Sequence, residues 1–316
     1  MQAPVLFTVL PCYNEEAVLH SSIRQMTDLY TTLISEGTIH GNSRLLFVND
    51  GSRDATWSII EESSAANPLV CGVKLARNVG HQNAILAGME TAKDHADVVV
   101  TIDADLQDDI TKIPEMLQKF TEGADIVYGV KKERKADSFF KRTTALMFYK
   151  LMKALGVHTV YNHADFRLMS KRAVKALSGY RERNLFLRGI IPQLGYKTDT
   201  VEEDLREREA GESKYTLSKM LNLAVDGITS FTIKPVRLIF TLGMVFVLLA
   251  IIMLIYVICV VVQGKTVAGW ASLMLSMWFI GGCILIGLGI VGEYVGKIYL
   301  EVKDRPRYNI EKTLIQ

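Results

Sequence analysis

Two long apolar segments near the C-terminus constrain the fold of this chain more than any other feature of its sequence. Residues 238–262 form a run of 25 residues without a charged side chain, and residues 270–292 form a second run of 23. A helix of about 20 apolar residues spans the hydrocarbon core of a bilayer. Because only a short loop separates the two runs, the sequence predicts a transmembrane hairpin rather than two buried helices of a soluble protein.

Basic residues around these runs predict how the hairpin is oriented. Lys234 and Arg237 precede the first run, whereas the loop between the runs contains only Lys265. Five further basic residues follow the second run: Lys297, Lys303, Arg305, Arg307 and Lys312. Segments rich in Lys and Arg beside transmembrane helices stay in the cytoplasm. We therefore expect a multi-pass protein whose two termini and N-terminal region, residues 1–230, face the cytoplasm.

The N-terminal part of the chain has the pattern of an α/β domain. Apolar runs typical of strands occur at residues 5–10, 45–49, 70–75, 98–102 and 125–130. Helical patterns lie near residues 15–34, 54–63, 82–93 and 113–121. Short apolar strands that alternate with helices are typical of a mainly parallel sheet with helices on both faces. The sequence therefore predicts a Rossmann-like α/β domain.

Polar residues follow the first four predicted strands, at the point where each strand ends. They lie at residues 13–15, 49–52, 77–78 and 103–109. In open parallel sheets, ligands bind beyond the carboxyl ends of the strands. We therefore expect these four segments to form one binding site. The six histidines of the chain show no metal-ligand spacing. His81 could lie near this binding site, but we assign it no role.

The fourth of these strand ends carries a cluster of carboxylates. Residues 98–109 read VVVTIDADLQDD, an apolar run that stops in acidic residues. Residues i and i+2 of a strand point to the same side, so we expect Asp103 and Asp105 to reach one point. Carboxylate oxygens suit Mg²⁺ or Mn²⁺, which also bind substrate phosphate. The alternative is a solvated turn, in which Asp residues are common.

The segment that follows the predicted sheet contains further charged clusters. A basic helix is predicted at residues 138–155, and a polar cluster at residues 165–168 precedes a predicted helix at residues 171–177. Residues 202–215 are charged and contain glycine, which is typical of a loop. Apolar residues at helical spacing in residues 215–231 predict an amphipathic helix on the membrane surface, with an ordinary packing helix as the alternative.

Four motifs of this chain occur in the order seen in family 2 glycosyltransferases, which the chain resembles. They are PCYNE at residues 11–15, NDGSRD at residues 49–54, RNVG at residues 77–80 and DADLQD at residues 103–108. The chain most resembles the polyprenyl-phosphate glycosyltransferases, a group that includes bactoprenol glucosyltransferases and dolichyl-phosphate mannose synthases. The resemblance covers nearly the whole chain and implies a GT-A fold, which is a Rossmann-like α/β domain with a mainly parallel sheet.

The resemblance also implies an activity. One sugar would pass from a nucleotide-sugar, with UDP-glucose favoured, to undecaprenyl phosphate, with inversion at the anomeric carbon. The reaction would take place at the cytoplasmic face of a bacterial plasma membrane and modify a cell-envelope glycan. UDP-N-acetylglucosamine, UDP-galactose and GDP-mannose also fit the motifs. A processive polysaccharide synthase and a non-enzymatic nucleotide-sugar sensor or flippase subunit are the alternatives.

Carried over motif by motif, the resemblance implies roles for individual residues in donor and metal binding. Nucleotide-sugar binding falls to seven residues: Pro11, Tyr13, Glu15, Asp50, Arg77, Asp103 and Asp105. Asp105 and Gln107 would hold the divalent metal, Mg²⁺ or Mn²⁺. Asn49 stands where many members of the family carry an Asp, which puts the base or sugar preference in question.

A second group of residues is expected to act on the acceptor. Acceptor-phosphate binding, in part from a predicted lid, falls to Arg134, Arg142, Arg206, Arg208 and Lys214. The catalytic residues would be Asp105, Asp165, Arg134, Arg142 and Arg167, among which Asp165 acts as a base or positions other groups. Cleavage of the sugar–diphosphate bond builds negative charge, which a divalent cation and arginines stabilise. The acceptor phosphate is already an anion, so a strong general base is unnecessary.

These inferences define four regions along the chain. We expect a catalytic domain at residues 1–214, an amphipathic juxtamembrane helix at residues 215–234, two transmembrane helices within residues 235–296 and a cytoplasmic tail at residues 297–316. The formal net charge of +2 gives no sign of nucleic-acid binding. Glycines in the second apolar run permit close helix packing, so we expect a homo-oligomer.

Overall fold

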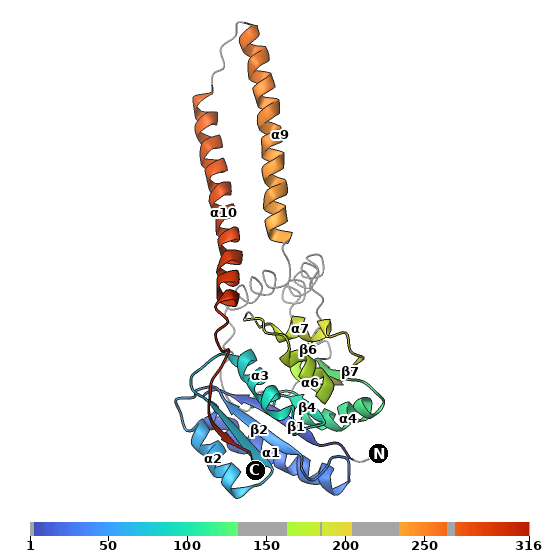
Figure 1. The fold of residues 1–316 in the computed structure, drawn as a ribbon. Coiled ribbons are helices and arrows are strands. Elements are labelled where there is room, and N and C mark those ends of the chain that lie inside the picture. The colour runs from blue at the N-terminus through green and yellow to red at the C-terminus, as the bar shows by residue number, and fades with distance from the viewer. Residues whose placement is uncertain (1–2, 132–162, 184, 204–233, 264–268, 316) are drawn as a thin grey trace. The chain divides into compact units, whose positions relative to one another are not determined.

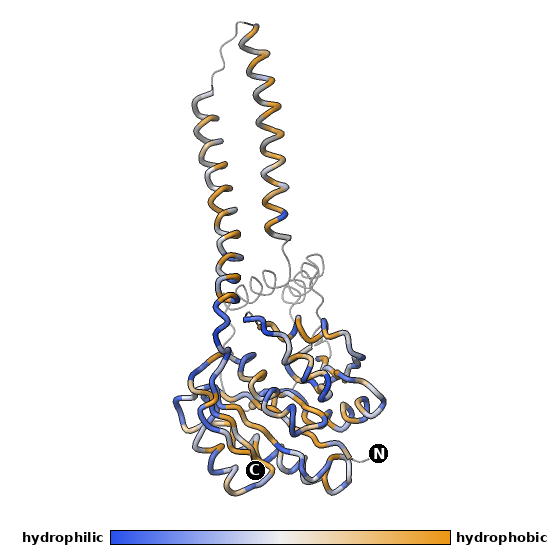
Figure 2. Tube along the Cα trace, in the orientation of Figure 1, coloured by the Kyte–Doolittle hydropathy of each residue, from blue (hydrophilic) through white to orange (hydrophobic). Residues whose placement is uncertain are grey.

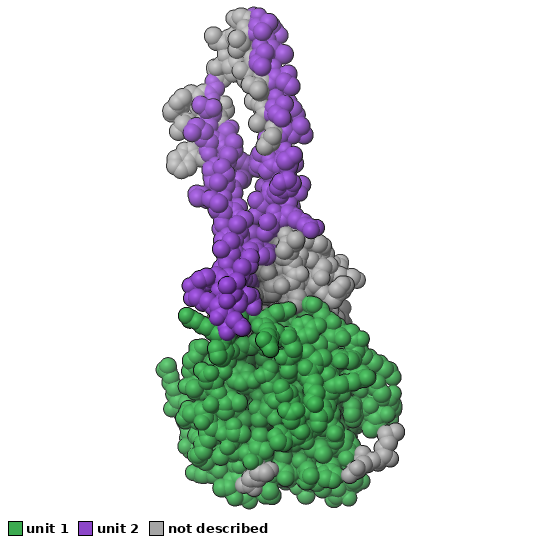
Figure 3. Space-filling view, in the orientation of Figure 1, with its two compact units in different colours: residues 1–153, 158–216, 305–316 green, residues 154–157, 217–304 purple. Residues whose placement is uncertain are grey.

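The computed structural model describes residues 3–131, 163–183, 185–203, 234–263 and 269–315. The chain divides into two compact units (Figure 3). Unit 1 contains residues 1–153, 158–216 and 305–316, and unit 2 contains residues 154–157 and 217–304. The predicted basic helix at residues 138–155 and the predicted amphipathic helix at residues 215–231 lie outside the described residues.

Unit 1 is built on an eight-stranded mixed sheet with the strand order β7-β5-β6-β4-β1-β2-β3-β8 (Figure 1). The strands are β1 (Leu6–Cys12), β2 (Arg44–Asn49), β3 (Val70–Leu75), β4 (Val98–Thr101), β5 (Ile126–Lys131), β6 (His163–Ser170), β7 (Thr198–Glu203) and β8 (Ile310–Leu314). Strands β3, β2, β1 and β4 run parallel, as do β5 and β7. Strands β6 and β8 are antiparallel to their neighbours. The predicted mainly parallel α/β sheet is therefore confirmed.

Helices cover both faces of this sheet. They are α1 (Glu16–Ser35), α2 (Thr56–Ala66), α3 (His81–Ala92), a 3-10 turn η1 (Ile110–Lys112), α4 (Ile113–Thr121), α6 (Lys171–Ser178) and α7 (Leu187–Gln193). Apolar residues of α1, α2 and α4 pack with one face of β1, β2 and β4 in the main core. Helix α3 packs on the other face, where Gly88 lies so close to Val9 and Val48 that no Cβ atom fits. The central strands are buried on both faces, which explains their almost continuous apolar sequences.

Strand β6 differs from the sequence-based prediction. Residues 165–168 were expected to open a polar cluster, but they lie in the middle of β6, between β4 and β5. The two charged residues of this segment pair with each other inside the sheet, since Asp165 accepts a hydrogen bond from the fully buried Arg167. A buried charge is tolerated when a partner of opposite charge is hydrogen-bonded to it.

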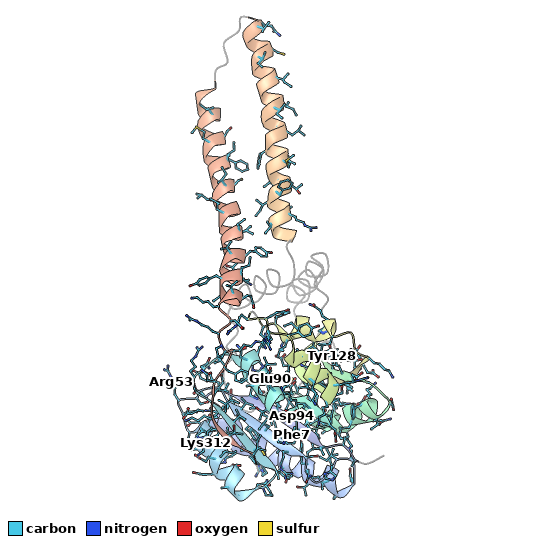
Figure 4. All side chains as sticks on the ribbon, viewed as in Figure 1. Phe7, Arg53, Glu90, Asp94, Tyr128 and Lys312 are labelled. Carbon is cyan, nitrogen blue, oxygen red and sulfur yellow. The ribbon has the colours of Figure 1, made fainter. Side chains whose placement is uncertain are left out.

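The C-terminal segment returns to the sheet as strand β8, which was not predicted. It pairs with β3 in antiparallel register, and the amide of Ala76 donates to the carbonyl of Asn309 at 2.9 Å. Lys312 pairs with Glu61 of α2, and the hydroxyl of Tyr308 donates to Glu90 of α3. Figure 4 labels Lys312 and Glu90. Residues 305–316, near the end of the chain, are thus part of unit 1.

Unit 2 contains two long helices, α9 (Lys234–Val262) and α10 (Trp270–Val302). They contain the two apolar runs, but α10 extends to Val302, beyond the predicted span and into the predicted tail. Both helices are coloured mainly as hydrophobic in Figure 2. Within the described residues, one helical segment, Phe279–Val302, is long and apolar enough to cross a membrane. A transmembrane hairpin therefore stays a prediction. Close packing between the helices is local, since Gly287 lies against Ile239 whereas Gly292 and Gly296 face open space.

Candidate functional site

The ends of β1 and β2 are held together by hydrogen bonds between their polar segments. The side-chain oxygen of Asn14 accepts a hydrogen bond from the backbone amide of Arg53 at 2.9 Å, and the backbone amide of Asn14 donates to Ser52 Oγ at 3.0 Å. The amide of Glu15 donates to Thr56 Oγ1 at 2.9 Å. These bonds place Tyr13, which is 38% exposed, and Glu15 at the edge of the sheet. Pro11 lies buried within β1.

Asp50 links the end of β2 to the start of α3. Its carboxylate accepts hydrogen bonds from the amides of Val79 at 2.7 Å and Gly80 at 3.0 Å, and the residue is 3% exposed. Burial raises the pKa of Asp50 above its usual value, and the two hydrogen bonds oppose that shift. In this structure the carboxylate therefore fixes the RNVG turn. The sequence-based role of Asp50 in nucleoside binding stays a prediction.

Gly51 brings the second and third strand ends into direct backbone contact. Its φ angle is 65°, and a Cβ atom would lie 2.5 Å from the backbone nitrogen of Asn78 and 2.6 Å from the carbonyl carbon of Arg77. Only glycine fits such a close approach. The exposed Arg77 is held beside the Asp50 segment by this contact.

Gly51→Ala is expected to lower the free energy of unfolding by about 2 kcal/mol or more, because left-handed strain of about 1–2 kcal/mol adds to the backbone clash. Gly37→Ala is the matched control, because Gly37 has a similar φ of 70° and a Cβ atom added there would meet no other atom within 4 Å. Thermal unfolding checks both variants; equal effects would contradict the clash.

The acidic segment after β4 forms a turn in which Asp105 and Gln107 meet. The strand ends at Thr101, so the pair Asp103 and Asp105 is placed by this turn and not by strand alternation as predicted. Leu106 has a positive φ of 47° and a buried side chain, which directs its two neighbours to one side. Gln107 Nε2 donates to Asp105 Oδ2 at 2.7 Å.

This turn fits a divalent cation that is shared with a substrate. A carboxylate and an amide oxygen are ligands that Mg²⁺ and Mn²⁺ accept, and Mg²⁺ is commonly held by one or two carboxylates plus substrate phosphates. Across the described ranges of the chain, no group of three or more His, Cys, Asp or Glu side chains converges on a metal position. Asp105 and Gln107 would thus supply two ligands, with a diphosphate and water completing the set.

His81, for which no role was predicted, lies between two of the acidic residues. Its Nε2 atom is 3.4 Å from Asp103 Oδ1 and 3.4 Å from Asp165 Oδ2. The hydrogen bond to Asp165 and the charge of Asp103 raise the pKa of His81, although burial opposes the shift. Burial and the nearby carboxylates raise the pKa of Asp103 to about 6. His81 begins α3, a helix end that favours negative charge.

Asp165 is surrounded by cationic side chains from three elements. Arg167 of β6 donates to Oδ1, and Arg188 of α7 donates to both oxygens, with 3.0 Å from Nη2 to Oδ2. Together with His81, these charges hold the pKa of Asp165 well below its usual value, although burial alone would raise it. Arg188 is placed by its neighbour Leu187, whose amide donates to Gln82 Oε1 at 2.8 Å.

Two further buried carboxyl groups lie next to the Asp105–Gln107 turn. Glu203 at the end of β7 is 0% exposed and Asp108 is 3% exposed, and the amide of Asp109 donates to Glu203 Oε2 at 3.2 Å. Burial and the charge of Asp108 raise the pKa of Glu203 to about 7. Lys131 at the end of β5 lies 3.5 Å from Asp108 through its Nζ atom.

The raised pKa of Glu203 predicts a pH-dependent stability. A carboxyl whose pKa rises on folding destabilises the folded state as pH increases from its ordinary 4.5 to about 7. Glu203→Gln removes this ionisation, so it is expected to stabilise the protein at pH 8 by on the order of 2 kcal/mol and to have little effect at pH 4.5. Thermal unfolding at both pH values checks the difference; the same shift at both would contradict it.

Some of the predicted site residues lie outside the described residues, namely Arg134, Arg142, Arg206, Arg208 and Lys214. The described ones come from the ends of β1, β2, β3 and β4 and from β6. Sequence reasoning missed His81, Arg188 and Glu203. The signal for His81 is its position directly after the RNVG motif, whereas Arg188 and Glu203 join the site only through tertiary contacts.

Comparison with known proteins identifies the family. A family model described as glycosyl transferase family 2 matches residues 8–178, which include all four motifs and Asp165. The chain belongs to glycosyl transferase family 2. It is therefore a transferase, and its family 2 glycosyltransferase domain supplies the strand ends and the acidic turn described above.

Two curated relatives extend this likeness over almost the whole chain. The glycosyltransferase YkoT of Bacillus subtilis is 52% identical over 308 residues, which cover 98% of this chain and 91% of that protein. The SfII prophage-derived bactoprenol glucosyl transferase of Shigella flexneri is 40% identical over 313 residues, which cover 96% of this chain and 97% of that protein. This family 2 glycosyltransferase is thus of the bactoprenol type that its sequence predicted.

A solved structure supports the fold. The mannosyltransferase PcManGT of Pyrobaculum calidifontis, solved in complex with GDP-Man and Mn²⁺, superposes with a TM-score of 0.50 and 16% sequence identity. The match covers 74% of this chain and 65% of that one. With the mixed, mostly parallel sheet of unit 1, it confirms the predicted GT-A fold.

Proposed function

We propose that this enzyme transfers a single sugar from a nucleotide-sugar, with UDP-glucose favoured, to a polyprenyl phosphate such as undecaprenyl phosphate. The observation that carries the proposal is the 40% identity to a bactoprenol glucosyl transferase over 96% of this chain. The reaction is inverting, because a single in-line displacement inverts the configuration at the anomeric carbon. The product serves the modification of cell-envelope glycans.

The acidic turn is proposed to bind the donor and its metal. Asp105 and Gln107 would hold Mg²⁺ or Mn²⁺, which supplies charge stabilisation to the leaving diphosphate when bound. Asp103 contacts the nucleotide-sugar, with Arg77, Tyr13, Glu15, Pro11 and Asp50 around the nucleoside. His81 orients the Asp103 carboxylate, since it lies 3.4 Å from Asp103 Oδ1.

Asp165 is proposed to position other groups and not to act as a base. Both of its oxygens already accept hydrogen bonds from Arg167 and Arg188, and its pKa is held low. A base with so little affinity for a proton removes one inefficiently at neutral pH. The acceptor phosphate is ionised already, so it needs cations instead. Arg188 and the sequence-based candidates Arg134 and Arg142 would supply them.

The strand β8 supports a hairpin that crosses the membrane twice. Strands β3 and β8 belong to the same sheet of unit 1, although α9 and α10 lie between them in the chain. A chain that leaves and re-enters one domain on one side of a membrane must cross it an even number of times. We therefore propose that α9 spans the membrane together with α10. By the positive-inside rule, we propose that unit 1 and both termini lie in the cytoplasm.

A direct assay tests the proposed function. Full-length protein is purified into lipid nanodiscs and mixed with undecaprenyl phosphate, Mg²⁺ or Mn²⁺, and labelled UDP-glucose, UDP-N-acetylglucosamine, UDP-galactose or GDP-mannose. We expect labelled lipid with UDP-glucose, and none after chelation of the metal. Label from another donor would correct the sugar. No labelled lipid from any donor, with the protein shown to be folded, would contradict the proposal.

A further inference from the structure

The Asp105–Gln107 turn continues into a buried segment next to β7, the strand at one edge of the sheet. Asp108 and Asp109 follow Gln107 in the chain, and Glu203 is the last residue of β7. Asp108 and Glu203 are almost completely buried.

Glu203 holds the backbone of the segment that follows Gln107. Its Oε2 atom accepts a hydrogen bond from the amide of Asp109 at 3.2 Å. On the neighbouring strand, Lys131 is paired in register with Glu203 and reaches Asp108 at 3.5 Å. The ends of β5 and β7 thus hold two consecutive residues of the segment, one through its side chain and the other through its backbone.

We propose that Glu203 is a positioning residue of this glycosyltransferase: it holds the backbone of Asp109 so that the Asp105–Gln107 turn presents its oxygens to a divalent cation. The inference rests on the metal-binding role proposed above. Glu203 acts through the segment that it holds.

The turn needs such an anchor because its backbone is strained. Leu106 adopts a positive φ of 47°, which costs about 1–3 kcal/mol for a residue other than glycine and persists only when surrounding contacts hold it. Asp108 and Asp109, the residues held by Lys131 and Glu203, directly follow Gln107. A shift of these residues would therefore displace Asp105 and Gln107. Partners behind metal ligands commonly change metal affinity by about 10- to 100-fold when they are replaced.

The experiment measures Mn²⁺ binding to full-length protein in nanodiscs, with the free ion followed by electron paramagnetic resonance. Glu203→Leu removes the hydrogen bond to the Asp109 amide and is expected to weaken Mn²⁺ binding by about 10-fold or more. Glu203→Gln keeps an acceptor for that amide, so it is expected to bind Mn²⁺ like the parent protein. Glu202→Leu, on the exposed side of the same strand, is the matched control and is expected to change nothing.

Unchanged Mn²⁺ affinity in a folded Glu203→Leu variant would overturn the inference. Should that variant fail to fold, Glu203→Asp replaces it, because the shorter side chain withdraws its oxygens and is expected to weaken binding to a lesser extent. Loss of affinity in Glu203→Gln equal to that in Glu203→Leu would also overturn it. Asp105→Ala separates the two proposals, since Mn²⁺ binding that survives this change contradicts the metal site itself and not only its anchor.

Discussion

Asp105→Asn is expected to reduce sugar transfer by about 100- to 1000-fold at saturating donor, which is the usual effect of removing one electrostatic contact to a leaving group. The substitution keeps the size of the side chain and an acceptor for Gln107, so the turn is expected to fold. It removes the charge that a divalent cation requires. The assay is initial-rate transfer of labelled sugar to lipid, with Mg²⁺ and Mn²⁺ titrated separately.

A charge-matched control distinguishes this effect from a general change in electrostatics. Asp94 lies at the surface of the same unit, where its side chain is 65% exposed, so Asp94→Asn removes one carboxylate without touching the site (Figure 4). We expect transfer by this variant to equal that of the parent protein. Parental activity in Asp105→Asn at every metal concentration would contradict the role of Asp105.

The sheet was predictable where burial alone determines the sequence. Strand β3 and helix α4 have the bounds that their apolar patterns predicted, residues 70–75 and 113–121. Residues of β3 are buried on both faces of the sheet, and residues of α4 are buried along one stripe of the helix. The spacing of apolar residues therefore predicts both elements. The clustering of four polar strand ends was predictable for the same reason, because parallel topology brings them to one edge.

Elements stabilised by paired charges were not predictable in this way. Strand β8 is exposed along most of its length and is held by pairs such as Lys74 with Glu311, at 2.8 Å. Strand β6 contains Asp165 and Arg167, whose charges compensate each other only in the folded protein. No local pattern shows which charge will meet which. The roles of His81 and Glu203 were not predictable for the same reason, since each contacts residues that are distant in the sequence.

Asp165→Asn is expected to have the largest effect on both stability and activity. Arg167 is fully buried, and removal of the charge that pairs with it leaves a guanidinium without compensation, at a cost of about 3–5 kcal/mol. Activity is expected to fall by about 1000-fold or more, because His81 and Arg188 lose the carboxylate that orients them. Chemical denaturation and lipid labelling measure the two effects.

Asp125→Asn provides the matched comparison for stability, because Asp125, directly before β5, also pairs with an arginine, Arg172 of α6. The guanidinium of Arg172 is 67% exposed, so water solvates it once the pair is broken, and we expect a much smaller loss of stability than in Asp165→Asn. The double variant Asp165→Asn with Arg167→Met removes the buried charge and is expected to recover much of the stability but none of the activity. Recovery of activity would mean that Asp165 serves the fold alone, whereas recovery of stability without activity separates its packing role from its action on His81 and Arg188.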